Sequence, residues 1–307
     1  MKKLIGYLRL MRPANVVTAV ADVLAGMAIG GYFSPFFGPY NGNYGWGQAI
    51  KPDLTGVLLV CLSTIGLYSG GIIMNDVFDS KLDAVERPER PIPSGLISKN
   101  AATIFGGICF FIGIFAAGLL GKNTQYLAVA IMISCLVYDK FLKHSAVFGP
   151  INMGLCRGLN LLLGISVLNG PIQQYWYLAI VPIIYIAAIT MISRGEVHGG
   201  NKNTLYFAWA LYVIVIVSIL YFAFLNNQLL ITLVFIIPFA IMIFIPLAKA
   251  IQNPIGPNIG KAVKSGVIAL ILMNAAWASA FGIFIIAIII VVLLPISIGL
   301  SKAFAVT

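Results

Sequence analysis

The sequence predicts an all-α integral membrane protein, a single bundle of nine transmembrane helices over residues 1–307 with room for an additional C-terminal segment. Three observations predict this class: 60% of the 307 residues are hydrophobic, only 9% are charged, and the mean hydropathy is +1.00. A soluble domain carries about 25% charged residues, so this chain cannot cover a water-facing surface. Soluble enzymes, nucleic-acid binders and disordered chains are therefore excluded.

Long apolar runs locate the predicted spans, because the hydrocarbon core of a bilayer requires about 20 apolar residues in a helix. Eight runs of this kind cover residues 14–33, 54–74, 101–121, 126–142, 147–168, 176–193, 205–225 and 229–248. The ninth run, 265–300, is much too long for one crossing at about 1.5 Å per residue. It is either one span followed by a further segment or a hairpin that turns near residues 280–282.

Basic residues predict the orientation of the bundle. The N-terminal segment and every second connection after it hold 15 of the 19 Lys and Arg residues, whereas the opposite connections hold only Lys51 and Lys122. Cytoplasmic loops of membrane proteins carry the excess of Lys and Arg, and they face anionic lipid. We therefore expect a multi-pass protein of the cell inner membrane with a cytoplasmic N-terminus. The net charge of +10 is explained without nucleic acid.

The four cysteines, Cys61, Cys109, Cys135 and Cys156, all lie in apolar runs. None belongs to a CxxC pair or has a histidine at ligand spacing. They are predicted to be small core residues rather than redox groups or metal ligands.

Acidic residues are concentrated directly after the second predicted span. Five of the nine lie between Asp76 and Glu89. If the helix continues past Met74, then Asn75, Asp79 and Asp83 fall at i, i+4 and i+8 and share one stripe of its surface. Amide and carboxylate oxygens suit Mg²⁺, and neighbouring carboxylates require a cation or a proton. The stripe predicts a Mg²⁺ site with Asp76 close by; the alternative is a solvated acidic loop.

The segment from Asn75 to Gly95 reads N-D-x-x-D-x-x-x-D and then R-P-x-R-P-I-P-S-G, and it resembles the first aspartate-rich motif of the UbiA superfamily. Members of this superfamily are intramembrane prenyltransferases with nine helices. The resemblance covers most of the chain. Similar positions include Arg12-Pro13-x-Asn15 before the first span and Tyr138, Lys143, Asn152, Arg157 and Gly164 around the fourth and fifth helices.

The connection between the sixth and seventh spans departs from the family pattern. Residues 193–202 read S-R-G-E-V-H-G-G-N-K, in which Glu196 is the only acid, whereas the family has two or three aspartates there. Glu196 can still supply one metal ligand, and His198 titrates near neutral pH, as a base would. The alternative is a glycine-rich connecting loop. The run also resembles the UbiA-like branch of bacterial ebo gene clusters.

Arg157 lies inside the fifth predicted span, where a charge is costly unless it faces a cavity or a partner. Arginine forms bidentate hydrogen bonds with phosphate, and Asn160 follows one turn later. These two residues are predicted to bind a diphosphate. The alternative is a structural ion pair between Arg157 and Asp22.

The residues and the resemblance together predict an enzyme with Mg²⁺ as cofactor, which transfers a prenyl group from a prenyl diphosphate. The acceptor is an aromatic compound or a polar alcohol such as a cyclitol. The predicted catalytic residues are Asp76, Asp79, Asp83, Glu196 and His198, and the predicted metal ligands are Asn75, Asp79, Asp83 and Glu196. The predicted substrate-binding residues are Asn15, Lys81, Arg87, Tyr138, Lys143, Arg157, Asn160, Arg194 and Asn201. Two other functions remain open, a non-catalytic prenyl-lipid binder and a cation-coupled transporter.

Overall fold

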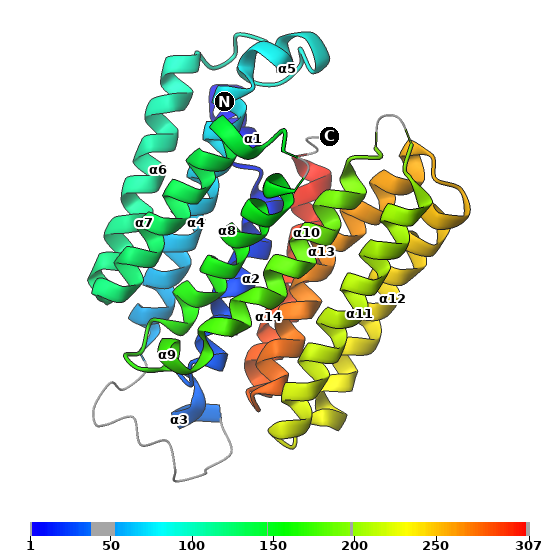
Figure 1. Ribbon diagram of the computed structural model, residues 1–307. Helices are drawn as coiled ribbons and strands as arrows, with labels where there is room; N and C mark the ends of the chain where they lie inside the picture. Colours follow the sequence, from blue (N-terminus) through cyan, green and yellow to red (C-terminus); the bar gives the residue numbers. More distant parts are fainter. Residues whose placement is uncertain (1, 38–52, 146, 197–198, 305–307) are drawn as a thin grey trace.

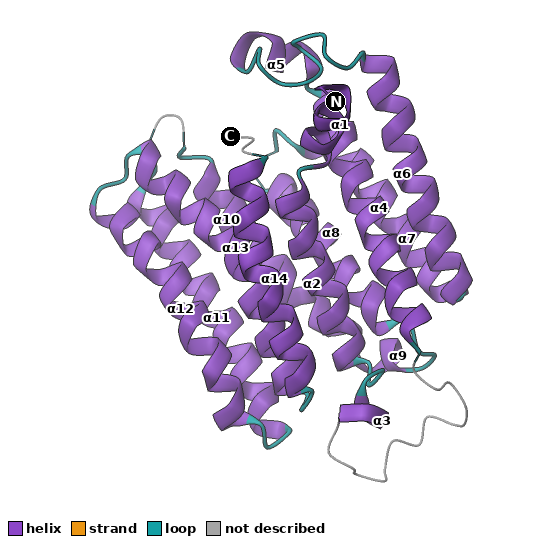
Figure 2. Cartoon of the chain, turned by 180° about the vertical axis from the view of Figure 1, so that it is seen from behind, coloured by secondary structure: helices purple, strands orange, loops and turns teal. Residues whose placement is uncertain are grey.

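The computed structural model describes residues 2–37, 53–145, 147–196 and 199–304, and the regular elements in these ranges are all helices (Figures 1 and 2). Within these ranges, eight helices are long and apolar enough to cross a membrane, and a bent pair makes a ninth. The eight are α4 (Leu54–Phe78), α6 (Lys99–Leu120), α7 with η1 (Lys122–Leu142), α9 to α10 (Pro171–Ser193), α11 (Lys202–Leu225), α12 (Leu229–Gln252), α13 (Gly256–Ala280) and α14 (Phe284–Ala303). The predicted class, an all-α multi-pass membrane protein, is confirmed.

The first predicted span, residues 14–33, corresponds to α2 (Pro13–Ile29), the second helix of the bent pair. Helix α1 (Lys2–Met11) and helix α2 (Pro13–Ile29) meet at Arg12 with an angle of 43°. Because Pro13 lacks an N–H group, it starts a helix without losing a hydrogen bond, but it cannot continue α1. A short helix, α3 (Ser34–Phe37), follows α2.

The fifth predicted span, residues 147–168, forms α8 (Phe148–Ile165). It is not among the eight helices above; the polar residues Asn152, Arg157 and Asn160 interrupt it, and all three are buried. It packs against α2, α7 and α10. Its polar residues therefore face protein rather than lipid.

The long C-terminal run is a hairpin, one of the two predicted alternatives. Helix α13 ends at Ala280, a turn with Gly282 at φ +82° follows, and α14 begins at Phe284. Helix α14 packs along α2 and α13 and returns the chain to the end that holds the N-terminus (Figure 1). The same end carries α1, α5 (Ser80–Glu86) and the connection after α10, whereas α3 and α9 lie at the other end. The predicted basic segments thus gather at one end of the bundle.

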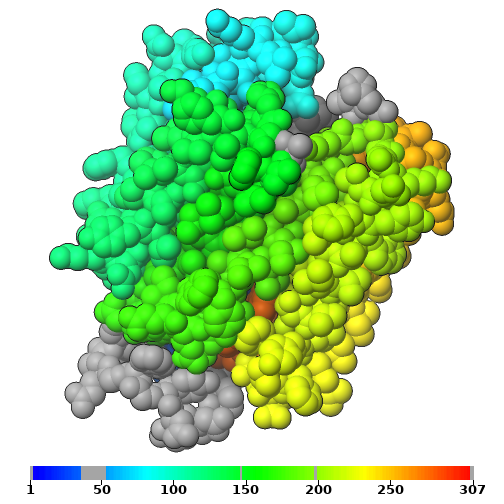
Figure 3. All heavy atoms as spheres, in the orientation of Figure 1, coloured from blue at the N-terminus to red at the C-terminus, as the bar shows by residue number. Residues whose placement is uncertain are grey.

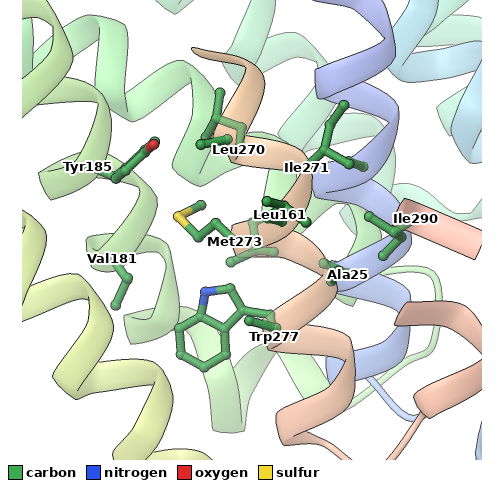
Figure 4. Packing of buried hydrophobic residues seen from close by; sticks show 14 of the residues in the cluster. Ala25, Leu161, Val181, Tyr185, Leu270, Ile271, Met273, Trp277 and Ile290 are labelled. Atoms are coloured by element: carbon green, nitrogen blue, oxygen red, sulfur yellow. The ribbon is translucent and has the colours of Figure 1, made fainter. Parts of the chain in front are cut away.

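Helix α13 lies in the interior and organises the core. Trp277, Met273 and Tyr185 from α13 and α10 are at most 1% exposed, and Figure 4 shows them packed together with Leu161 of α8. Figure 3 shows one face of the molecule, on which atoms of α8, α10 and α11 are seen and orange atoms of the C-terminal part of the chain are visible between them. Large apolar side chains such as Phe207 and Phe224 remain exposed on α11, as expected for a surface that faces lipid.

Two glycines bring α2 and α8 into backbone contact. A Cβ atom on Gly26 would lie 2.2 Å from the carbonyl oxygen of Leu161, and one on Gly164 would lie 2.2 Å from that of Val23. A larger residue at either position would push the helices apart. This crossing closes the bundle beneath the polar residues of α8.

Candidate functional site

Arg12 is placed by the break between α1 and α2. Its backbone adopts a left-handed conformation, φ 47° and ψ 67°, which is strained for a residue with a Cβ atom. One guanidinium nitrogen donates to Asp76 Oδ1 at 2.6 Å. Backbone strain of this kind persists only where the surrounding structure stabilises it. Here the ion pair with Asp76 stabilises it and joins the start of α2 to the aspartate-rich segment.

Asp76 and Asp83 share one buried arginine. Arg90 lies 2.7 Å from Asp83 Oδ2 and 3.4 Å from Asp76 Oδ1, and all three side chains are at most 7% exposed. Removing charges from water is costly, and pairing with hydrogen bonds offsets that cost. These residues therefore hold the segment after α4 against the bundle.

Asn75 and Asp79 bond to a different set of partners. The Asn75 side-chain amide donates to Asp139 Oδ1 at 2.6 Å, and the Lys143 ammonium donates to Asp79. Residues Tyr138–Leu142 form η1, a π-helix, whose wide turn is closed by a bond from the Lys143 N–H to the Tyr138 carbonyl at 2.9 Å. Such turns recur at functional sites. Lys143 directly follows this π-helix. Asp139 within the π-helix and Lys143 after it therefore both bond to residues at the end of α4.

The prediction that Asn75, Asp79 and Asp83 share one helical stripe is wrong. Helix α4 ends at Phe78, Asp79 caps it, and the separate helix α5 (Ser80–Glu86) lies across its end (Figure 1). The chain turns at Asp79, and the Asp83 carboxylate forms an ion pair with Arg90, the same arginine that contacts Asp76. The three side chains therefore have different partners: Asp83 bonds Arg90, Asn75 bonds Asp139, and Asp79 bonds Lys143.

A cavity of about 330 Å³ opens beneath Asn75, between α4, α7, α8, α10 and α13. Its mouth is polar, with Arg12, Asn15, Asn75, Tyr138, Asp139 and Lys143 in the wall. Its deeper wall is largely apolar and includes Leu67, Ile72, Ile131, Ile186, Ile189 and Leu270. An amphiphile with an anionic head and a hydrocarbon tail fits this distribution of groups.

The deep end of the cavity is polar again. Arg157 donates to Asp22 Oδ2, to Thr18 Oγ1 and to the Tyr68 hydroxyl, each at 2.7 Å. Asp22 also accepts from the amides of Asn160 at 3.1 Å and Asn274 at 2.7 Å. The structural alternative for Arg157, a pair with Asp22, is thus present, although Arg157 and Asn160 also line the cavity.

Of the second motif, Ser193 lines this cavity, whereas Glu196 does not. Glu196 lines a neighbouring cavity of about 530 Å³ with Lys264, and the two cavities share Arg12 and Asn15. Desolvation in the cavity wall raises the pKa of Glu196 above its usual range, and the Arg87 guanidinium partly offsets this rise. His198 lies outside the described residues.

The remaining predicted substrate-binding residues have other contacts. Arg194 donates to the Ser145 carbonyl at 2.6 Å and joins α10 to the segment before α8. Asn201 caps α11 by accepting from the Asn203 N–H at 2.9 Å. Lys81 and Arg87 are exposed on α5 and at its end, and neither lines the two cavities described above.

Sequence reasoning missed Asp139, the acid that bonds Asn75. The signal was available, because an acid inside a predicted span is costly and therefore informative. It also left Arg12 and Arg90 without a role, although both stand inside the quoted motifs. Their role depends on ion pairs that join residues 64 and 14 positions apart, respectively.

The chemistry of the mouth fits a divalent cation that is shared with a substrate. The oxygen ligands in its wall belong to Asn75 and Asp139, and the Asp79 carboxylate bonds Lys143 of the same wall. Amide and carboxylate oxygens are hard ligands. Within the described ranges, no group of three His, Cys, Asp or Glu side chains is arranged to hold a metal alone. Mg²⁺ commonly uses one or two carboxylates together with substrate phosphates and water, so two acids and an amide suffice.

The fold and the site define a class: multi-pass helical membrane proteins with a polar mouth above an apolar internal cavity. Comparison with known proteins identifies the family within this class. Residues 36–263 match the UbiA prenyltransferase family, so the chain belongs to that family, as the motifs predicted. The resemblance to the ebo branch is not tested by these comparisons and stays a prediction.

Relatives of known name and structure agree with this assignment. Digeranylgeranylglyceryl phosphate synthase of Methanothrix thermoacetophila is 35% identical over 157 residues, which cover 51% of this chain and 52% of that protein. The chain spans about half the length of the curated relatives it matches. A UbiA homologue from Archaeoglobus fulgidus, solved with GPP and Mg²⁺, superposes with a TM-score of 0.66 at 16% identity, covering 90% of this chain and 99% of its own. That likeness shows a shared fold.

Proposed function

We propose that this protein is a Mg²⁺-dependent intramembrane prenyltransferase that moves a prenyl group from a prenyl diphosphate to an acceptor. The observation that supports this most directly is the cavity itself, with oxygen donors and Lys143 at its mouth and aliphatic side chains below. The relatives named above act on or bind prenylated compounds, which supports the same reaction.

The residues of the mouth orient the donor. Lys143 and Arg12 place cationic groups beside the diphosphate, while the aliphatic wall takes the prenyl chain. In the reaction the bond between the allylic carbon and the diphosphate oxygen breaks, and the diphosphate leaves with both electrons. Tyr138 lies at the mouth, where its ring can stabilise the allylic cation. Water is excluded by the surrounding apolar helices.

Mg²⁺ held by Asn75, Asp79 and Asp139 would neutralise charge on the departing diphosphate. The sequence also predicts Asp83 and Glu196 as metal ligands. Asp83 would have to break its ion pair with Arg90 before it could bind the metal. The acceptor is an alcohol or an aromatic compound, and it forms the new bond to the allylic carbon as it loses a proton. Glu196, in the adjoining cavity, and His198 are the candidate bases.

Lipid extracts test the proposal. Cells that produce the protein are expected to contain a prenylated compound that is absent, by mass spectrometry, from cells that produce the Asp79→Asn variant at equal level. Membranes from the first cells should form the same product from added prenyl diphosphate, and chelation of divalent metal by EDTA should reduce its formation to background. A folded protein that binds donor but yields no product in either assay would instead be a non-catalytic prenyl-lipid binder.

We also propose that the end with both termini faces the cytoplasm of a cell inner membrane, in line with its basic residues. Cysteines introduced at Ala84 in α5 and at Lys202 of α11 lie at this end, and one at Asn123 of α7 lies at the other. A membrane-impermeant maleimide added from the periplasmic side should label Asn123→Cys and leave Ala84→Cys and Lys202→Cys unmodified. The opposite labelling pattern would invert the topology.

A further inference from the structure

We infer that the wall of the internal cavity holds a second metal site, a pair of thiols from α7 and α8 that binds a soft, thiophilic ion such as monovalent copper. This site goes beyond the proposed function, whose chemistry does not use the thiols. It is carried by the contact between Cys135 and Cys156, by their place in the cavity wall and by the softness of sulfur as a ligand.

Two of the four cysteines lie against each other. Cys135 Sγ of α7 and Cys156 Sγ of α8 are 3.8 Å apart, and both residues line the cavity beneath Asn75. All four cysteines are free thiols, and the sequence predicts each of them to be a core residue. Cys61 and Cys109 line neither of the two cavities described above. A ligand in the cavity beneath Asn75 therefore meets the paired thiols and not the other two.

The distance between the two sulfurs suits a shared metal ion. Thiolates bind metal ions at about 2.3 Å, so two sulfurs that share one ion lie about 3.3–4.6 Å apart. The observed 3.8 Å falls within this range. The Asn152 amide donates to the Ser134 carbonyl at 2.8 Å and so ties α8 to α7 beside the pair. Gly71 of α4 leaves room for the Cys135 sulfur, because a Cβ atom there would lie 2.9 Å from it.

The ligands select a soft ion of low coordination number. Sulfur ligands favour soft ions such as Cu⁺, whereas the oxygen ligands of the mouth, Asn75 and Asp139, favour Mg²⁺. Asp139 follows Cys135 by four residues, about one helical turn, so the two kinds of ligand are separated along α7 and η1. Within the described ranges no third His, Cys, Asp or Glu side chain joins the thiols in a metal-binding group, which disfavours a four-ligand zinc site.

The charge of the complex is small. The two thiols release two protons as they bind, so a Cu⁺ ion with two thiolates carries one net negative charge. Arg12, Lys143 and Arg157 line the same cavity, so the complex faces cationic groups. Their field offsets part of the cost of burying a negative charge.

A bound ion is also expected to compete with the prenyl donor. Both sulfurs line the cavity about one helical turn below the mouth, beside the space that the proposed function assigns to the first isoprene unit. An ion held by the thiols takes up part of that space. This consequence rests on the proposed function, whereas the thiol site itself does not.

Copper binding tests the site directly. The full chain in nanodiscs, kept anaerobic with ascorbate, is titrated with Cu⁺ in competition with a chromophoric Cu⁺ chelator. The parent should retain one Cu⁺ per chain, and Cys135→Ala or Cys156→Ala should lower the affinity at least about tenfold, the smallest effect usual for a change at a metal site. Cys61→Ala and Cys109→Ala are the matched controls and should bind as the parent does. Tight binding that survives the loss of both paired thiols, or no binding by the folded parent, would overturn the inference.

Competition with a donor analogue tests the effect on the cavity and keeps the two proposals apart. A non-reactive phosphonate analogue of a prenyl diphosphate with one isoprene unit is titrated into the same nanodiscs with Mg²⁺ present. Cu⁺ at about ten times its own Kd should raise the apparent Kd of the analogue about tenfold in the parent, as for two competing ligands, and leave it unchanged in Cys156→Ala. Equal affinity with and without bound Cu⁺ would contradict the competition and place the ion outside the donor's path. Failure of the analogue to bind the copper-free parent would instead overturn the proposed function and leave the thiol site standing.

Discussion

Replacing Arg157 by alanine is expected to lower the free energy of unfolding by about 3–5 kcal/mol, the usual cost of leaving one partner of a buried ion pair uncompensated. The guanidinium donates to Asp22, Thr18 and Tyr68 at 2.7 Å, and it is 5% exposed. Its loss leaves Asp22 with two amide donors and no countercharge. Thermal denaturation in a fixed detergent measures the effect.

The matched control separates a scaffold role from a role in substrate binding. Asp22→Asn in the Arg157→Ala background removes the uncompensated charge and should recover part of the lost stability. Arg157→Lys retains the charge but cannot reach three partners with a planar fork, so it should fall between the parent and Arg157→Ala. We expect prenyl diphosphate affinity in Arg157→Lys to stay within about threefold of the parent. A tenfold or larger loss of affinity in a stably folded Arg157→Lys protein would return Arg157 to the substrate site.

The helices could be predicted from the sequence because lipid imposes one requirement on every span. Each must satisfy its own backbone hydrogen bonds and present apolar side chains over the same thickness. This is why the run from residue 54 to 74 became α4 and the run from 205 to 225 became α11. Hydropathy alone could not decide between a hairpin and a longer segment after residue 265, since both are equally apolar. The turn at Gly282, where φ is +82°, decides it.

The identity of the site residues was easier to predict than their arrangement. Charge in an apolar chain is informative, so the region around Asn75 and Asp79 stood out at once. The partners of these residues could not be predicted in the same way. Helical spacing describes a single helix and gives no information about Arg90 or Lys143, which come from other segments of the chain. Asp83 shows the consequence: it has the spacing of a third ligand, yet an ion pair with Arg90 directs it elsewhere.

Asp79→Asn is expected to weaken Mg²⁺-dependent binding of a prenyl diphosphate by about one hundredfold while the protein remains folded. The substitution keeps size and one oxygen but removes the negative charge that a hard cation requires and that Lys143 contacts. A charged hydrogen bond or ligand contributes about 1.5–3 kcal/mol, and the upper part of that range corresponds to a hundredfold change in affinity. Isothermal titration in nanodiscs, with Mg²⁺ and with EDTA, measures both conditions. Affinity with EDTA should change little.

Asp83→Asn is the informative comparison, because Asp83 belongs to the same motif but bonds Arg90 in a buried cluster. If the arrangement described here persists with donor bound, Asp83→Asn should cost stability and leave the Mg²⁺-dependent gain in affinity within about threefold of the parent. If donor binding instead releases Asp83 from Arg90 to complete the metal shell, the two variants should lose that gain equally. Unchanged affinity in both variants, with Mg²⁺ present, would exclude this segment as the metal site. The ratio between Asp79→Asn and Asp83→Asn therefore measures whether the turn between α4 and α5 rearranges when the donor binds.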